Sequence, residues 1–264
     1  SDLRDGRRPE SNQGIPIRTT EKGEGMNLSI SIGRSMTIGA FVVVLAVGVG
    51  RATGSTPLVT HQGSNDPTLE SPPWPRVQLE NQFVEGPGTE NGTDYWSIAT
   101  VGSIVTYNYP LTPSALADPS GWTATVRMRE VESMGIHGPE SMFWVRDGSR
   151  TWQLLFSGNN ANPAVNGLYT LTDAEMPKIV AMDPAADYHI YQLVHAFGSG
   201  TAGVYIDGAW AADITGATYP DTREIGFGEG STAHNGTGHW AYASYQVGQN
   251  VVPEPTSIAL LALG

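Results

Sequence analysis

The segment 142–156 combines an aromatic ring with polar side chains at a spacing suited to binding a ligand. Alternation along two strand-like runs places Trp144, Arg146 and Gln153 on one face of a predicted hairpin. The C–H faces of sugars stack on aromatic rings, while neighbouring polar groups bind the sugar hydroxyls. These three residues are therefore candidates for carbohydrate binding. The alternative is that Trp144 packs beneath a loop.

Two further pairs of side chains extend this candidate set. Arg127 and Arg129 alternate with apolar residues in a strand-like run and so share one face. His189 and Tyr191 stand two positions apart on a later run. If the strand of Arg127 neighbours that of Trp144, arginines from both strands favour an acidic polysaccharide. Arginine, histidine and tyrosine are also the residue types that polysaccharide lyases use, so a lyase stays open as an alternative.

A glycoside hydrolase would require two carboxylates about 5–9 Å apart on either side of the scissile bond. Glu130 and Glu132 come closest to such a pair, because simple alternation places both on one strand face. The third position and the aspartate of the glycosidase pattern are absent, which favours a solvated strand end. The histidines show no spacing typical of a metal site. We therefore assign no catalytic residue, and the metal stays unknown.

Charge limits the classes of partner. The chain of 264 residues has a net charge of −12 and contains no cysteine. An acidic surface repels the phosphate backbone of nucleic acids, so nucleic-acid binding is not expected. Disulfides are excluded for this sequence because there is no cysteine to form them.

Short strands and turns dominate the predicted secondary structure. The sequence has 32 glycines and 18 prolines, and no stretch longer than about ten residues shows helical periodicity. Asp147-Gly148 between two strand-like runs predicts a hairpin with a type I′ turn, and Asp207-Gly208 turns the chain again further on. Consecutive antiparallel strands at this spacing predict one all-β sandwich domain over 76–248.

The N-terminal part of the chain has the pattern of a targeting signal. Residues 26–54 combine positive charge, an apolar run and small residues, which predicts a secretory signal peptide cleaved after Gly54. Residues 1–25 are polar, and we interpret them as a disordered leader or translated upstream sequence. Residues 55–75 are rich in proline, serine and threonine, and are interpreted as a linker or a first irregular strand.

Near the other end, a Pro-Glu-Pro triplet runs into a short apolar segment. The motif residues are Val252, Pro253, Glu254 and Pro255. The tail 249–264 resembles a truncated PEP-CTERM sorting signal of exopolysaccharide-producing Gram-negative bacteria. The resemblance implies an exported protein that an exosortase-type enzyme processes and that reaches the cell surface or the extracellular matrix. Contact with a membrane would then be transient, through the signal peptide and this tail.

A second resemblance concerns the fold. Tyr188, His189 and Tyr191 form a "Tyr-His-x-Tyr" strand, and after a Gly-rich turn the run 204–208 reads "Val-Tyr-x-Asp-Gly". This pattern resembles the concanavalin A-like lectin/glucanase superfamily, particularly its laminin-G-like members. The resemblance implies an antiparallel jelly-roll β-sandwich in which Asp207 has a structural role. It also implies that rim loops could hold calcium.

Together these observations predict an exported, surface-sorted protein whose lectin-like sandwich binds carbohydrate or matrix polysaccharide without catalysis. Two alternatives stay open. A polysaccharide-degrading enzyme on the same fold would require paired carboxylates, or a Tyr/His/Arg cluster, in a concave groove. A structural matrix protein without a ligand site would lack an exposed aromatic side chain there.

Overall fold

The computed structural model describes residues 56–79, 82–133, 140–230 and 235–249. The predicted leader, the signal peptide and the sorting motif Val252 to Pro255 lie outside these residues. Among the helices of the described part of the chain, none has the length and apolar character needed to cross a membrane.

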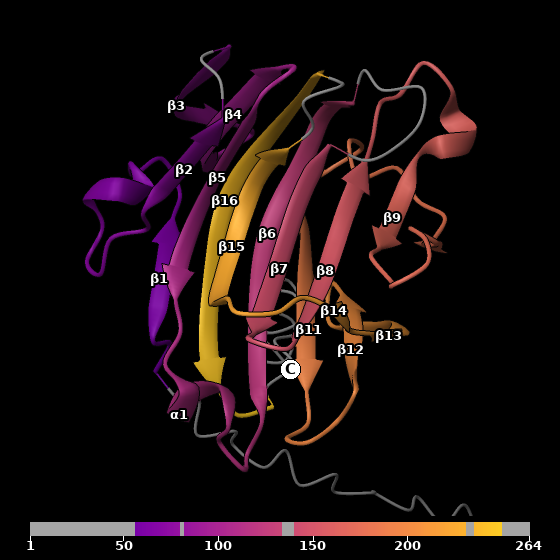
Figure 1. The fold of residues 1–264 in the computed structure, drawn as a ribbon. Coiled ribbons are helices and arrows are strands. Elements are labelled where there is room, and N and C mark those ends of the chain that lie inside the picture. The colour runs from indigo at the N-terminus through magenta and orange to yellow at the C-terminus, as the bar shows by residue number, and fades with distance from the viewer. Residues whose placement is uncertain (1–55, 80–81, 134–139, 231–234, 250–264) are drawn as a thin grey trace, which may run out of the picture. The chain divides into compact units, whose positions relative to one another are not determined.

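Two antiparallel sheets form the fold (Figure 1). Sheet A has the strand order β13-β12-β11-β6-β16-β4-β3, and β1 also pairs with β16. Its strands are β1 (Val59–Gln62), β3 (Phe83–Glu90), β4 (Thr93–Val101), β6 (Trp122–Ser133), β11 (His189–His195), β12 (Thr201–Ile206), β13 (Ala209–Thr215) and β16 (Asn235–Val247). Strand β1 falls within the range 55–75 and is held in the sheet by its pairing with β16.

Sheet B has the strand order β10-β9-β8-β7-β15-β5-β2, and β14 also pairs with β8. Its strands are β2 (Arg76–Leu79), β5 (Ile104–Pro110), β7 (Ser141–Asp147), β8 (Arg150–Ser157), β9 (Gly167–Thr170), β10 (Lys178–Val180), β14 (Ala217–Thr218) and β15 (Arg223–Gly230). The helical elements of the described residues are single turns, α1 (Pro113–Leu116), η1 (Pro67–Leu69) and η2 (Pro163–Val165). The predicted all-β, antiparallel jelly-roll sandwich is confirmed.

The core lies between the sheets and follows the predicted alternation. On β6, Val126 and Met128 are fully buried and face the other sheet. On the β7–β8 hairpin, Phe143 pairs with Leu154, and both side chains are fully buried. Complete burial of such a side chain stabilises the fold by roughly 1.5–3 kcal/mol. The buried apolar residues therefore determine which face of each strand points into the core.

The β7–β8 turn differs from the prediction by one residue. Arg146 pairs with Thr151, which makes Gly148 and Ser149 the central residues rather than Asp147 and Gly148. Of the two central residues, only Gly148 has a positive φ, 92°. A type II′ turn has a positive φ at its first central residue alone, whereas a type I′ turn has one at both. The Asp147 carboxylate instead accepts hydrogen bonds from the backbone N–H groups of Ser149 and Arg150. The turn at Asp207-Gly208 has positive φ at both residues, 52° and 81°, which fits type I′.

Two register shifts decide which side chains reach the outer face of sheet A. Trp240 pairs with Met128 and Tyr242 with Arg127, so Ala241 is an extra residue in β16. Likewise Glu130 pairs with Gly238 and Glu132 with Thr237, so Val131 is extra in β6. A bulge of this kind moves the residues beyond it to the opposite face relative to simple alternation.

Candidate functional site

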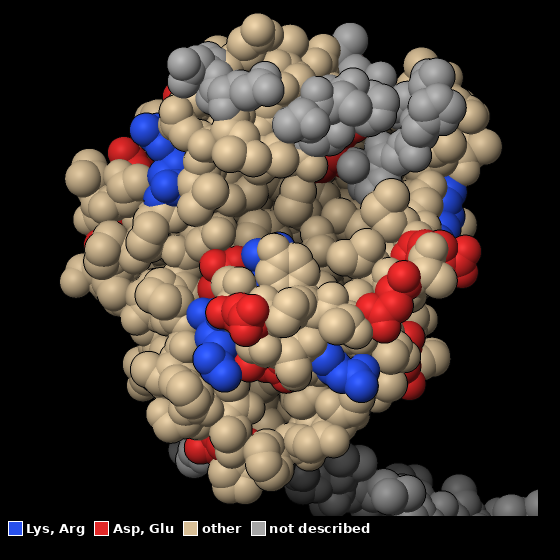
Figure 2. Space-filling model, in the orientation of Figure 1, with Lys and Arg blue, Asp and Glu red and all other residues tan. Residues whose placement is uncertain are grey.

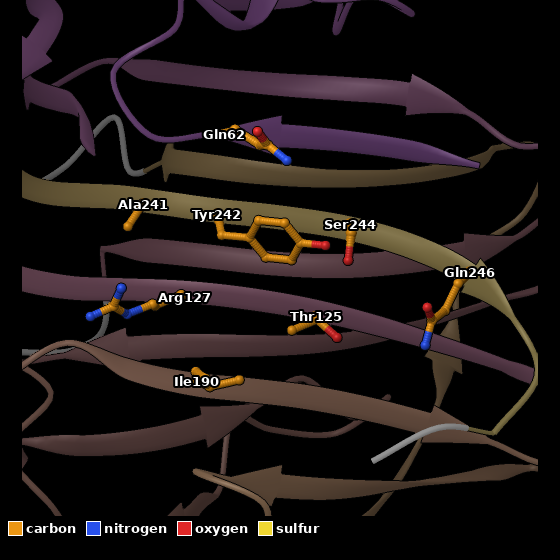
Figure 3. Close-up of a pocket in the computed structure, with 8 residues that line it drawn as sticks. All are labelled: Gln62, Thr125, Arg127, Ile190, Ala241, Tyr242, Ser244 and Gln246. Carbon is orange, nitrogen blue, oxygen red and sulfur yellow. The ribbon is translucent and has the colours of Figure 1, made fainter. Parts of the chain in front are cut away.

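A groove crosses four strands on the outer face of sheet A (Figure 3). Its cavity volume is about 420 Å³, within the range of small-molecule sites. We call it the sheet A groove. Its lining residues are Gln62, Thr125, Arg127, Ile190, Ala241, Tyr242, Ser244 and Gln246.

The register of β1, β16 and β6 assembles the groove. Tyr242 on β16 lies opposite Gln62 on β1 and Arg127 on β6. One step along, Ser244 pairs with Thr125. Directly opposed residues present their side chains on one face, so an aromatic ring, an arginine and several hydrogen-bonding groups converge. Figure 3 shows the Tyr242 ring extending along β16 toward Ser244.

Arg127 is the basic side chain of the groove. Its Nη2 donates to Thr93 Oγ1 at 3.2 Å, and its guanidinium carbon lies 5.5 Å from the centre of the Tyr188 ring. No carboxylate of the described residues is within ion-pair distance of it. A guanidinium without a carboxylate partner retains donors that can bind a hydroxyl or an anionic oxygen of a ligand.

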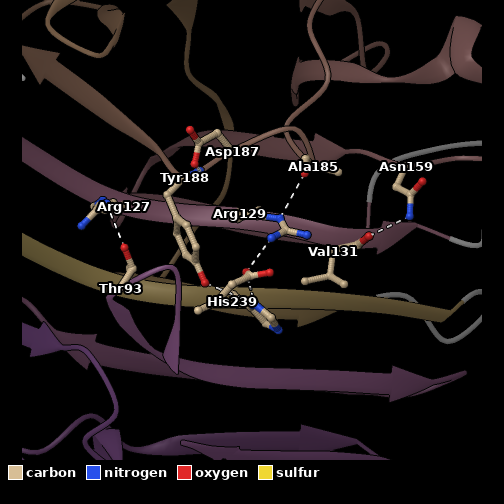
Figure 4. A network of polar contacts seen from close by, with 10 residues as sticks. Thr93, Arg127, Arg129, Val131, Asn159, Ala185, Asp187, Tyr188 and His239 are labelled. Carbon is tan, nitrogen blue, oxygen red and sulfur yellow. Dashed lines mark hydrogen bonds and ion pairs between the residues drawn. The ribbon is translucent and has the colours of Figure 1, made fainter. Parts of the chain in front are cut away.

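A polar network beside the groove holds the other candidate arginine of β6 (Figure 4). Arg129 Nη1 lies 2.5 Å from Glu90 Oε2, and its Nε donates to the carbonyl of Ala185 at 3.0 Å. The hydrogen bond from Arg129 lowers the pKa of Glu90 below its usual value. Arg129 is thus neutralised by a protein carboxylate, which sets it apart from Arg127.

His239 completes this network. Its ring stacks on Tyr95 with centres 3.7 Å apart, and its Nδ1 is 3.2 Å from the Tyr188 hydroxyl. Burial lowers the pKa of His239, against the opposing effect of Glu90. The imidazole is therefore neutral at pH 7, and it adds no cation to this face.

The candidates Trp144, Arg146 and Gln153 lie on the outer face of sheet B. Strands β6 and β7 belong to different sheets, so the arginines of β6 do not join Arg146 on one face, as they would if the strands were neighbours. The Trp144 ring is only 2% exposed, and its Nε1 donates to Glu224 Oε1 at 3.1 Å. Gln153 is buried too, with its Nε2 3.5 Å from the sulfur of Met142.

Arg146 is occupied by protein groups. Its Nη1 lies 2.6 Å from Glu224 Oε1, and its guanidinium carbon lies 3.9 Å from the centre of the Tyr219 ring and 4.9 Å from that of Trp144. Figure 2 shows other basic side chains that lie beside acidic ones on the face in view. The same face is hollowed near its centre. The contacts of Trp144, Arg146 and Glu224 form a packed cluster that stiffens sheet B.

The candidates on β11 point away from the sheet A groove. Tyr191 is fully buried, with its ring 4.7 Å from that of Phe156 in the core. His189 Nδ1 lies 2.6 Å from Asp207 Oδ2, and Asp207 Oδ1 accepts from the backbone N–H of Ile190 at 2.8 Å. This places the His189–Asp207 pair at the β12–β13 turn, where it orders the hairpin.

Glu130 and Glu132 do not share a strand face. Glu130 lies on the core face of β6 together with Val126 and Met128, and it is fully buried. The bulge at Val131 follows it and turns Glu132 to the opposite face, where Glu132 is exposed. The prediction of a solvated strand end is therefore wrong for Glu130, because the alternation that buries Val126 and Met128 also places Glu130 in the core. Glu130 lies instead with Glu140 and Glu229 in a buried group, which we call the carboxylate cluster.

The fold resemblance raised calcium as a ligand of rim loops. Within the ranges that the structure describes, no group of three or more His, Asp or Glu side chains is arranged to hold a metal ion.

Sequence reasoning selected Arg127 but missed its partners Tyr242, Ser244 and Gln246. The signal available in the sequence was that Tyr242, Ser244 and Gln246 alternate with Ala243 and Tyr245, which places the three on one strand face. The same alternation would also place Trp240 on the groove face, and the bulge at Ala241 is what separates Trp240, in the core, from Tyr242.

Comparison with known proteins identifies the fold. No protein-family model matches the sequence, and no curated protein matches it. A carbohydrate esterase from Shiga toxin-encoding bacteriophage phi24B superposes with a TM-score of 0.56 at 10% identity, over 74% of this chain and all of the phage chain. A β-glucanase of Bacillus licheniformis matches with a TM-score of 0.41 at 11% identity, over 70% of this chain and 98% of the glucanase.

The binding domain of botulinum neurotoxin DC also matches, with a TM-score of 0.46 at 11% identity. The match covers 72% of this chain but only 46% of the toxin chain. At identities this low, the similarities concern the fold alone.

Proposed function

We propose that this domain binds carbohydrate in the sheet A groove and performs no catalysis there. The observation that carries the proposal is the meeting of the Tyr242 ring with Arg127 and the polar side chains of Gln62, Thr125 and Ser244 in one cavity. An aromatic ring beside hydroxyl and amide groups matches the two sides of a sugar, its C–H face and its hydroxyls.

The charge of the groove favours an acidic sugar. Arg127 contributes the positive charge, while Arg129 is already paired with Glu90. In a chain of net charge −12, an arginine with no carboxylate partner among the described residues attracts a carboxylate or sulfate group of a ligand. The phage protein that shares the fold acts on carbohydrate, which is consistent with a glycan ligand on this scaffold.

A glycan array probed with the full chain, with and without calcium, tests the proposal. We expect binding to acidic polysaccharides, independent of calcium. Tyr242→Ala should weaken binding about tenfold, because aromatic stacking and burial contribute roughly 0.5–1.5 kcal/mol or more. Arg127→Ala should remove the preference for acidic over neutral glycans.

Arg150→Ala and Tyr219→Ala serve as matched controls, because both residues lie outside the groove on the side of sheet B. Equal losses in the controls, or no glycan bound by the unmodified protein, would reject the proposal. Release of new reducing or unsaturated sugar ends from a bound polysaccharide would replace it with the enzyme alternative.

We also propose that the protein is exported and sorted to a bacterial cell surface or matrix. The support is the sequence pattern of residues 26–54 and of the motif Val252 to Pro255. Expression in a host with an exosortase-type enzyme should yield a protein beginning at Ser55 and lacking the tail, as measured by intact mass. Retention of both segments in the surface fraction would refute the sorting pathway.

A further inference from the structure

An exposed tryptophan stands at the edge of sheet A, away from the groove. Trp210 on the edge strand β13 is 60% exposed, the most exposed aromatic side chain among the described large apolar residues. Its Nε1 donates to Asp213 Oδ1 at 3.4 Å, which restrains the orientation of the ring. Trp210 lies directly opposite Tyr205 on β12, so two aromatic side chains form a cross-strand pair.

The strand register places this aromatic pair on the same face as the groove. Successive cross-strand partners run from Ser244 to Thr125, then to Gln192, Tyr205 and Trp210. Each pair shares one face of the sheet. The neighbouring positions Val126 and Val204 are fully buried in the core, so this row lies on the opposite face of the sheet, where Thr125 and Gln192 are buried and Trp210 is exposed.

Gly203 supplies independent support for this arrangement. A Cβ at this position would lie 3.2 Å from the Tyr205 ring and 3.6 Å from Asp213 Oδ1. The ring of Tyr205 and the carboxylate that bonds Trp210 therefore occupy the same side of the sheet. The absence of a side chain at Gly203 leaves room for the Tyr205 ring to lie close to the strand.

The row extends well beyond the groove. Neighbouring strands lie ~4.8 Å apart, so the four steps from β16 to β13 cover about 19 Å. A single sugar in the groove cannot reach Trp210, but an oligosaccharide of several units laid across the strands can contact both aromatic positions. Between the two positions, Gln192 and Thr125 are buried, and Gln192 Nε2 donates to Thr125 Oγ1 at 3.2 Å.

We propose that Tyr205 and Trp210 form a second aromatic subsite, so that the ligand is an extended polysaccharide crossing the strands of sheet A. This inference rests on carbohydrate binding in the groove and deepens it, because it defines the ligand by its length. Trp210 binds a sugar unit distant from the one at Tyr242.

A length series of oligosaccharides tests the subsite. The probes are fragments of increasing length from the polysaccharide that binds best on the array, titrated by calorimetry against the full chain. For the unmodified protein, affinity should rise once the fragment is long enough to reach β13. Trp210→Ala should lower the affinity for long fragments about fivefold to tenfold and leave short fragments unchanged. Trp210→Phe should retain most of the gain.

Phe197→Ala is the matched control, because Phe197 is also an exposed aromatic residue, 55% exposed, but lies in the turn after β11 rather than on this row. Long fragments that bind Trp210→Ala as tightly as the unmodified protein would overturn the subsite. So would an equal loss for short and long fragments. If no fragment of any length binds the unmodified protein, carbohydrate binding itself fails, whereas binding without length dependence overturns only the subsite.

Discussion

Replacing Glu229 with glutamine should flatten the dependence of stability on pH. Glu229 on β15 is fully buried in the carboxylate cluster with Glu130 and Glu140. Ser141 Oγ donates to Glu229 Oε1, and Ser133 Oγ donates to Glu130 Oε1 at 2.7 Å. No basic side chain of the described residues pairs with any of the three carboxylates.

Burial disfavours the charged forms of these groups. It raises the pKa of Glu229 to about 8, and burial together with the charge of Glu229 raises the pKa of Glu140 to about 8. Burial and the same neighbouring charge raise the pKa of Glu130 well above its usual value. At neutral pH the folded cluster therefore retains protons that the unfolded chain has lost.

The sign of the effect follows from the folded and unfolded pKa values. The folded value, about 8, exceeds the ordinary value of 4.5, so the full stability is present below about pH 4.5 and is lost as pH rises through 8. One retained proton corresponds to ~1.4 kcal/mol per pH unit, or about 3 kcal/mol between pH 5.5 and pH 7.5. This is a large part of a typical domain stability of roughly 5–15 kcal/mol.

Urea denaturation at pH 5.5, 6.5 and 7.5 measures the change in the free energy of unfolding. The unmodified protein should lose stability steadily across this range. Glu229→Gln retains an acceptor for Ser141 but carries no charge, so its slope should be smaller and it should be the more stable protein at pH 7.5. Glu175→Gln, at an exposed acid, should leave the slope unchanged. A flat or rising profile for the unmodified protein would refute the reasoning, as would an unchanged slope for Glu229→Gln.

Three further predictions concern packing, the β12–β13 turn and the groove. Gly226→Ala should destabilise the fold by about 1–3 kcal/mol in urea denaturation, because the new Cβ would lie 2.3 Å from the Trp144 ring; an unchanged midpoint would show that the ring is not packed there. Asp207→Ala should lower the melting temperature more than Asp207→Asn, since asparagine tolerates the positive φ of 52° and can still accept from Ile190; equal losses would contradict this account. Binding of an acidic glycan should weaken as salt rises from about 0.05 to 0.5 M, and Arg127→Ala should reduce that salt dependence; an unaltered salt response would remove Arg127 from the contact.

Local pattern was sufficient to predict the strands and their buried faces. The alternation of Trp122 to Arg129 and the common face of Trp144, Arg146 and Gln153 are both found in the structure. The reason is that burial on one face of a strand imposes a period of two on the sequence. The turn at Asp207-Gly208 was predictable as well, because few residues adopt a positive φ at both central positions.

The candidate site was predictable only in part. Arg127 was selected from its residue type and face, and it lines the groove. Trp144 was selected on the same grounds, yet it is buried against Glu224 on the other sheet. Alternation along a strand shows that a side chain points away from the core. It does not show whether a neighbouring element covers that side chain.

The sequence by itself determined an acidic, cysteine-free, all-β domain with defined inner and outer strand faces, because composition and alternation are local properties of the chain. Only the tertiary structure decided that β6 lies between β11 and β16 rather than beside β7. It also decided that the bulges at Val131 and Ala241 turn Glu132 and Tyr242 outward. Strand partners and bulges depend on contacts between distant segments, and a ligand groove across several strands exists only once those contacts are made.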